Sequence, residues 1–317
     1  TQATSGLVTA SGAARGSEAA GLQAANGLLA TYVGLVEQAR ANNRQGFPVG
    51  AAYQRQARTV ATDLVAQLRG VEQLTRSRVD DDVARSYSAS WPFVLVTIVL
   101  MAAIVVGLGW LNKRWKRLVN VPLAAAGLIV ALVLVVGLFV NARAAANAGD
   151  ALRGPLTAAD LVAQARAAAF DARSNEALTL INRGNGAAYE TEWKRSMSIV
   201  ENALDDACTK HDAGCDAGFD DQTYRTAHTA IRTADDGGDW DSARSQVIDP
   251  ESDVSAAFTK LTDGTESALQ TEIDEATAAF DDAASPLGTL RVLVVIAGIA
   301  VAFLAVRGYG QRLREYR

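Results

Sequence analysis

The stretch LNKRWKRLV at residues 111–119 decides the fold of this chain, because four cations crowd into five residues between two long apolar runs. A bilayer core requires about 20 consecutive apolar residues in a helix. The windows 91–111 and 121–141 beside the basic stretch meet this requirement, and so does 287–306. Arg291 is the one charged residue in these windows, near enough to a boundary to reach the interface. A buried core helix is the alternative, but the length of the windows favours three membrane spans.

The basic residues predict the orientation of these spans. Short loops rich in Lys and Arg stay on the cytoplasmic side of a membrane. The loop between the first two spans contains Lys113, Arg114, Lys116 and Arg117, and arginines also follow the third span. Both flanks therefore give one topology for a multi-pass plasma-membrane protein with most of its mass extracytoplasmic. A nucleic-acid or heparin patch is the alternative for the loop, but a position between two spans disfavours it.

This topology divides the chain into seven segments. We expect an extracytoplasmic helical hairpin at 1–90, a span at 91–111, a cytoplasmic basic loop at 112–120, a span at 121–141, an extracytoplasmic acidic helical region at 142–286, a span at 287–306 and a cytoplasmic tail at 307–317. The chain begins at Thr1 without a preceding apolar run. We expect either a cleaved signal peptide or, in preference, an upstream span, which would give two copies of one hairpin unit.

Composition and periodicity predict an all-α fold. Hydrophobic residues make up 49% of the chain and aromatic residues only 6%, which is typical of helices. Apolar residues recur every three or four positions in 2–40, which predicts one helix that ends near 41–50, and a second helix then returns to Trp91. The predicted apolar stripe of the first helix consists of Leu22, Ala25, Leu29, Tyr32, Val33 and Val36. We expect a hairpin with arms of about 40 residues, or roughly 60 Å.

The region 142–286 repeats this plan with more interruptions. We expect helices over 159–184 and 186–210, one or two short helices over 220–247 broken at 235–240, and a last helix that begins at Pro250 and enters the third span. The expected apolar face of the helix over 186–210 consists of Trp193, Met197, Val200 and Leu204. Together with the first hairpin, the long arms would form a membrane-distal bundle of the four-helix type. Residues 142–287 contain 27 acidic and 12 basic residues. This excess disfavours binding to nucleic acid or to anionic lipid.

Two cysteines lie in CTKHDAGC at 208–215. A zinc site would need four ligands, and Cys208, Cys215 and His211 with Asp212 or Asp216 match no strong zinc pattern. In an extracytoplasmic segment a Cys208–Cys215 disulfide is the favoured interpretation. No catalytic motif, phosphate loop or metal-binding histidine pair occurs around His211 or His228. We therefore predict no enzymatic activity, no cofactor and no metal.

These features describe a receptor without an output domain, because the cytoplasmic loop and tail are too short to fold. A signal would need a separate cytoplasmic partner. Candidate contacts for an acidic partner surface are Lys113, Arg114, Lys116, Arg117, Arg312 and Arg314.

The stretch VEQARANNRQGFPVGAAY at 36–53, within residues 2–57, resembles the first outside segment of actinobacterial membrane proteins of the GlnX type. This resemblance implies four spans, two helical outside regions and a role in sensing extracellular amino acids. It also implies an extracytoplasmic glutamate/aspartate-binding lipoprotein, GlnH, as one partner and a soluble serine/threonine kinase, PknG, as the other. The present sequence lacks the first span of that plan.

Within this interpretation the turn at 42–50 is the candidate contact for the binding protein, through Asn43, Arg44 and Phe47; an ordinary helix connection is the alternative. Two other classes of function stay open. One is a structural or accessory subunit of a larger membrane complex or homo-oligomer, and PLAAAG at 122–127 permits close helix contact. The other is a direct sensor that binds a small molecule between its own helices. A channel or transporter is disfavoured, because the spans lack ionisable residues apart from Arg291.

Overall fold

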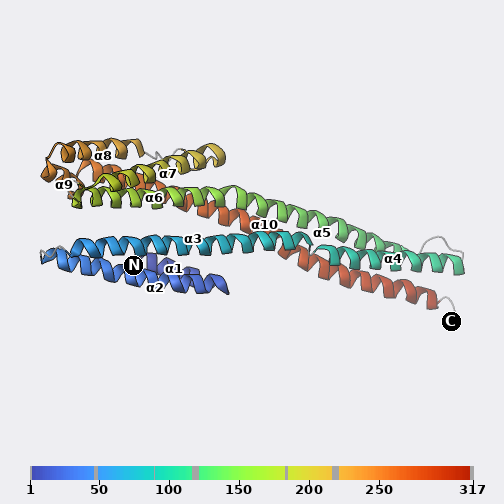
Figure 1. Cartoon of the computed structure of the whole chain (residues 1–317). Coiled ribbons are helices and arrows are strands. Elements are labelled where there is room, and N and C mark those ends of the chain that lie inside the picture. The colour runs from blue at the N-terminus through green and yellow to red at the C-terminus, as the bar shows by residue number, and fades with distance from the viewer. Residues whose placement is uncertain are drawn as a thin grey trace. The chain divides into compact units, whose positions relative to one another are not determined.

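The fold is all-α, as expected (Figure 1). The structure is a computed structural model that describes residues 2–45, 49–88, 90–115, 121–182, 185–215 and 221–314, and none of these lies in a strand. The helices in chain order are α1 (Gln2–Ala13), α2 (Ser17–Arg44), α3 (Gly50–Ser88), α4 (Ser90–Trp115), α5 (Val121–Arg153), α6 (Pro155–Ile181), α7 (Ala187–His211), α8 (Asp221–Asp236), α9 (Trp240–Ile248) and α10 (Asp253–Arg314). The chain divides into unit 1, Thr1–Arg85, and unit 2, Ser86–Arg317.

Unit 1 corrects the expectation of a single helix over 2–40. The chain turns between α1 and α2, where Gly16 adopts a φ of 55°, a conformation that glycine adopts without steric cost. The Oε2 atom of Glu18 accepts a hydrogen bond from the N–H of Arg15 at 3.3 Å, which closes this turn. The first arm is therefore the 28-residue α2, against 39 residues in α3. The expectation of two arms of about 40 residues each was wrong, because helical periodicity alone does not reveal a turn made at a single glycine.

The three helices of unit 1 bury a small apolar cluster. Leu7 of α1, Leu22 and Ala25 of α2, and Val71 of α3 form it. A Cβ atom on Gly21 would lie 2.5 Å from Cγ2 of Val71, so α2 approaches α3 closely at this glycine. Leu22 and Ala25 belong to the predicted stripe, whereas its later member Val33 is half exposed and Leu35 is buried in its place.

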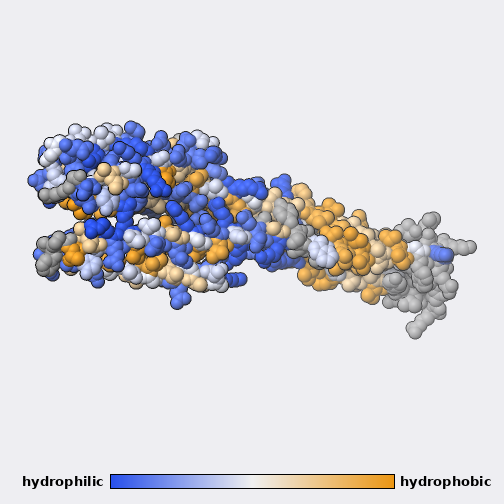
Figure 2. All heavy atoms as spheres, in the orientation of Figure 1, coloured by the Kyte–Doolittle hydropathy of each residue, from blue (hydrophilic) through white to orange (hydrophobic). Residues whose placement is uncertain are grey.

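Unit 2 contains the three apolar windows in α4, α5 and the second half of α10. Ile104 of α4 packs in a buried cluster with Leu123, Ala126 and Val130 of α5, and Val301 and Leu304 of α10 pack against this cluster. Hydrophobic residues also cover the visible outer surface of this part of unit 2, whereas its other helices are largely hydrophilic outside (Figure 2).

Three helical stretches in the described part of the chain are long and apolar enough to cross a membrane: Ser17–Arg44, Val121–Ile181 and Trp240–Gly308. The last two contain the expected windows 121–141 and 287–306. Helix α4 passes through the first window, and its segment Val94–Gly107 is a shorter apolar helix. The stretch in α2, which has the lowest mean hydropathy of the three, was not expected as a span. These apolar helices fit a membrane protein.

The longest helix, α10, runs 62 residues through Pro286 to the end of the described chain. It begins at Asp253, so the expectation of a start at Pro250 was wrong. The Oγ atom of Ser252 accepts a hydrogen bond from the N–H of Ser255 at 3.2 Å, which places a serine cap at the start of the helix. Pro250 lies in the turn before this cap.

The first half of α10 joins α6, α7, α8 and α9 in one helical region with a continuous core. The predicted face of α7 is confirmed, because Trp193, Met197, Val200 and Leu204 are all buried there. Helices α8 and α9 separate at the diglycine Gly237–Gly238, as expected from the break at 235–240. The bundle that would combine arms of both units stays a prediction.

Candidate functional site

A buried histidine lies at the centre of a charged network in the helical region. His228 of α8 is 2% exposed. Its Nδ1 lies 2.7 Å from Oε1 of Glu176 in α6, and its Nε2 lies 3.0 Å from Oε2 of Glu190 in α7. A neutral imidazole donates from one nitrogen only, whereas the imidazolium donates from both. The arrangement of two carboxylates therefore fits the protonated ring.

Helical spacing brings these groups to one place. Tyr224 and His228 are one turn apart on α8, Glu190 and Trp193 share a face of α7, and Arg173 precedes Glu176 by three residues on α6. Residues three and four apart in a helix lie on the same side. Three helices thus each turn a pair of these side chains towards the same interior point, which apolar side chains of the core surround.

Glu176 is the more enclosed of the two carboxylates in this network. It is 1% exposed and forms an ion pair with Arg173 through Oε2. The hydroxyl of Tyr224 donates to the same oxygen at 3.4 Å. A buried carboxylate is costly unless it is paired and hydrogen-bonded, and these partners together with His228 satisfy that condition.

The indole of Trp193 supports the charged form of His228. The two rings stack with centroids 3.6 Å apart and an interplanar angle of 10°. A cation over the face of a tryptophan is attracted by its quadrupole. Stacking therefore adds to the stabilisation that the two carboxylates give to the imidazolium.

Protonation equilibria follow from these contacts. Burial lowers the pKa of His228, but hydrogen bonds to Glu176 and Glu190 and their negative charges outweigh burial, so its pKa is raised above the ordinary value. Burial raises the pKa of Glu190, but its contacts with His228 and Lys194 prevail, so its pKa is lowered. Burial, followed by the charge of Glu176, raises the pKa of the Tyr224 hydroxyl.

A cavity of about 660 Å³ opens beside this network between the start of α7 and the end of α8. Trp193 lines it together with six charged side chains, three of each sign: Glu190, Lys194, His228, Arg232, Asp235 and Asp236. Arg232 pairs with Asp235 at 2.6 Å and also with Asp236. A cavity with this lining suits a small polar molecule that carries charges of both signs.

The network continues from the cavity to the start of α10. The Nη2 atom of Arg173 donates to the carbonyl of Val247 at 2.9 Å and to Oγ of Ser255 at 3.0 Å. Ser255 lies in the first turn of α10. His228, Glu176, Arg173 and Ser255 thus form one unbroken series of polar contacts from the cavity wall to the helix that enters the third apolar window.

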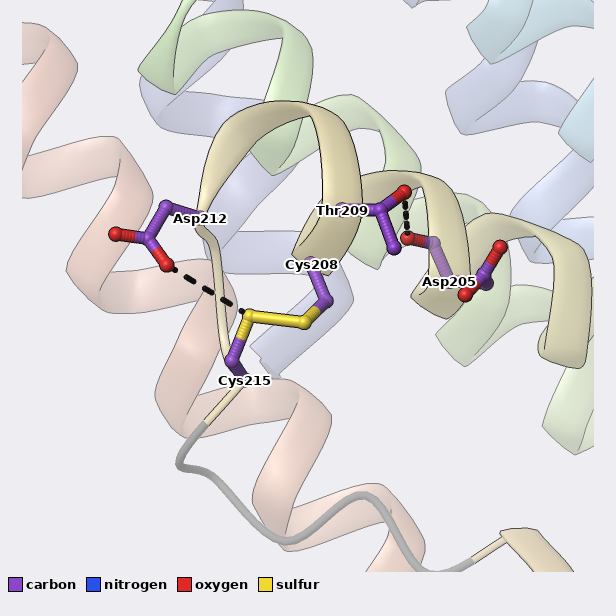
Figure 3. The surroundings of a disulfide bond; sticks show 5 residues. All are labelled: Asp205, Cys208, Thr209, Asp212 and Cys215. Carbon is purple, nitrogen blue, oxygen red and sulfur yellow. Dashed lines mark hydrogen bonds between the residues drawn. A yellow bond between two sulfur atoms is a disulfide. The ribbon is translucent and has the colours of Figure 1, made fainter.

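The two cysteines lie at bonding distance (Figure 3). The Sγ atoms of Cys208 and Cys215 are 2.09 Å apart, between the last turn of α7 and the segment that follows it. Both sulfurs are used in this bond, so neither thiolate is free for the zinc alternative. In the part of the chain that the structure describes, no group of three or more His, Cys, Asp or Glu residues could hold a metal ion.

The turn at 42–50 is only partly described. Asn43 and Arg44 are exposed at the end of α2, and Phe47 lies outside the described residues. Oδ1 of Asn43 lies 2.1 Å from where a Cβ atom on Gly50 would stand, so this side chain already contacts the start of α3. Arg44 is thus better placed than Asn43 to reach a partner.

Most of the candidate contacts for a cytoplasmic partner also lie outside the part of the chain that the structure describes. Lys113 is exposed on the last turns of α4. Lys116 and Arg117 lie outside the described residues, and so do the side chains of Arg114, Arg312 and Arg314. Their role as a partner surface stays a prediction.

Sequence reasoning missed the His228 network. His228 belongs to no sequence motif, because Glu176 and Glu190 lie 52 and 38 residues away in the chain. The helical phase of α8, with Tyr224, His228 and Ile231 on one side, is the signal that marks His228 as an inward-facing residue.

Comparison with known proteins gives one result. Residues 1–84 match the family described as an actinobacterial sensor domain. No curated protein and no solved structure matches the chain. The family match indicates a role in sensing and points away from catalysis.

Proposed function

We propose that this chain is a non-enzymatic receptor that passes a signal from extracytoplasmic helices through the membrane to a separate cytoplasmic protein. Helix α10 carries the proposal, because one helix joins the core of the helical region at Leu261 to the apolar window 287–306. A shift of such a helix by 1–2 Å at one end is the kind of displacement that known switches use.

Two features support the proposed orientation. The basic loop and tail favour a cytoplasmic location for both short connections. A disulfide between Cys208 and Cys215 suits an oxidising compartment. Protease added to intact cells should cut residues 142–286 and leave a tag at Arg317 intact, and the reverse pattern would contradict the topology.

The proposed partners follow from the resemblance to GlnX-type proteins. They are an extracytoplasmic glutamate/aspartate-binding lipoprotein such as GlnH and a cytoplasmic serine/threonine kinase such as PknG. The match of residues 1–84 to a sensor domain supports the sensing role, and the choice of these partners rests on the resemblance. Crosslinking of the full chain in native membranes should capture both proteins.

The contact at the helix turn can be tested with a matched control. Replacing Arg44 and Phe47 with Ala should reduce capture of the binding protein. Replacing Arg40, an exposed arginine one turn earlier that pairs with Glu37 at 2.8 Å, should leave capture unchanged. Equal capture by all variants would exclude this contact, and a large copurifying complex that ignores amino acids would favour the accessory-subunit class.

Direct sensing of a small molecule is a second candidate, and the charged cavity favours it. A panel of amino acids should then raise the melting temperature of the full chain in nanodiscs without any binding protein. Lys194→Ala should abolish the shift, because Lys194 lines the cavity, whereas Arg195→Ala should preserve it. Arg195 is a fair control, since it is equally exposed and pairs with Glu192 on the same helix. No shift with any amino acid would exclude amino acids as direct ligands.

A further inference from the structure

We propose that His228 is a protonation-dependent clasp: the imidazolium holds α8 against α6 and α7, and loss of its proton as the pH rises loosens this wall of the cavity. The clasp is a regulatory device beyond the proposed receptor role, and it does not depend on any partner.

The His228 side chain contacts two other helices at once. One ring nitrogen faces Glu176 and the other faces Glu190, at 2.7 and 3.0 Å, so a single side chain of α8 bridges two other helices. The neutral ring keeps one N–H. Its other nitrogen would then present a lone pair to a carboxylate oxygen, which replaces an attraction with a repulsion in a buried place.

Among the described contacts, His228 is the one cationic group that Oε1 of Glu176 receives from α8. The charged and titratable groups around His228 are Arg173 and Glu176 on α6, Glu190 and Lys194 on α7, and Tyr224 and Arg232 on α8. Arg173 already pairs with Oε2 of Glu176 and also donates to Val247 and Ser255, so it stays on the α6 side. Arg232 already pairs with Glu190 at 3.6 Å and with Asp235 and Asp236. From α9 and α10 the described network receives the neutral carbonyl of Val247 and hydroxyl of Ser255.

Protons can reach the clasp through the cavity. His228 and Glu190 both line it, and Glu190 keeps 18% of its side chain exposed. On the inner side the clasp connects through Glu176 and Arg173 to Ser255 in the first turn of α10. A change of protonation at the cavity therefore acts on contacts that fix the start of the helix leading to the third apolar window.

The direction of the pH effect follows from linkage. The pKa of His228 is raised in the folded chain, so the clasp is fully present below the ordinary histidine pKa of about 6.5 and is lost as pH rises through the folded value. Between these two values the population with α8 released rises by up to about tenfold per pH unit. Glu190 limits the clasp at the acidic end of the pH range. Because the pKa of Glu190 is lowered, the stabilisation that its carboxylate gives to the clasp is lost only when the pH falls through that lowered value.

The test uses the full chain in lipid nanodiscs. His211 and His228 are its only histidines, so histidine labelled at Cε1 gives two ring-proton signals in an NMR titration. One signal, absent in His228→Gln, should titrate above pH 6.5. Hydrogen exchange of α8, corrected for the intrinsic pH dependence, should accelerate across the same pH range. Unit 1 contains no histidine, so exchange of α2 should stay constant and serves as an internal control.

Variants make the proposal falsifiable. His228→Gln should remove the pH dependence of α8 exchange, and His211→Gln should retain it. Glu190→Gln, which changes only a side chain at the cavity rim, should shift the His228 titration to lower pH and keeps the test informative if His228→Gln unfolds. A His228 signal that titrates at or below pH 6.5, or an α8 exchange that is independent of pH in the wild-type chain, would overturn the proposal. Neither result would bear on whether the chain is a receptor.

Discussion

Both units bury a glutamate, but they neutralise it in different ways. Glu18 of unit 1 is 4% exposed and pairs with Arg78 at 2.9 Å, whose side chain is 39% exposed. Glu176 of unit 2 is 1% exposed and contacts His228, Arg173 and Tyr224, all largely enclosed. Glu18 is thus neutralised by a partly exposed cation that extends inwards from the surface, whereas Glu176 is neutralised within an enclosed network of partners.

The difference reflects how many helices surround each carboxylate. Unit 1 consists of three helices with one small apolar cluster, so its glutamate lies one side chain away from water. The helical region of unit 2 packs five helices around a core that includes Trp193, Met197 and Leu261. A charge there is largely removed from water and needs its own partners. The stability of unit 2 should therefore depend more strongly than that of unit 1 on a change of charge at its buried glutamate.

Glu176→Ala should have the largest effect. It leaves Arg173 and His228 in the interior without their common partner, and removal of one member of a buried ion pair typically costs about 3–5 kcal/mol. Hydrogen exchange of α6 and α8 in the full chain measures the loss of stability. Unchanged protection in both helices would contradict the network as a stabilising element.

Loss of the disulfide should rank second. The double variant Cys208→Ser, Cys215→Ser opens the loop that the disulfide closes between two residues seven positions apart. Chain entropy predicts that the loss of so short a closed loop lowers the free energy of unfolding by about 2 kcal/mol. Protection should fall at the end of α7 and stay unchanged in α2 and α3. A free-thiol assay on the wild-type chain purified without reductant serves as the control and should detect no thiol.

Glu18→Ala should cost less, about 1 kcal/mol, because Arg78 can turn to water when its partner is removed. The same variant also removes the acceptor for the N–H of Arg15, so the loss should be concentrated at the start of α2. If Glu18→Ala destabilised unit 1 as much as Glu176→Ala destabilises unit 2, the contrast drawn between the two interiors would be wrong.

Replacement of a third buried glutamate, Glu272, should have a small stabilising effect, whereas the three changes above destabilise the chain. Burial, and then the charge of Glu275, raises the pKa of Glu272 in α10. A raised carboxyl pKa means that the charged form destabilises the fold, so stability falls as pH rises above the ordinary glutamate value. Glu272→Gln should therefore slow exchange slightly around α10 at neutral pH, by a few tenths of a kcal/mol, and should have no effect below about pH 4. Faster exchange at neutral pH would contradict this.

The sequence by itself determined the features that depend on local pattern. Apolar length gave the windows in α5 and α10, the spacing of Trp193 to Leu204 gave the buried face of α7, and the diglycine at 237–238 gave the break between α8 and α9. These succeed because the hydrophobic effect and backbone freedom act within one helix. A single glycine at the α1–α2 turn and the serine cap of α10 were missed, since each depends on the conformation of one or two residues.

Only the tertiary structure decided the candidate site. Glu176, Glu190 and His228 come from three helices, and no spacing along the chain relates them. Glu176 and Glu190 alone have the sequence signature of ordinary helical surface positions, and the helical phase of α8 marks His228 only as an inward-facing residue. What makes them a site is that packing removes them from water together, so that their charges interact at short range and must balance one another. That requirement exists only after the helices have assembled, which is why the sequence contains the residues of the site but not the site itself.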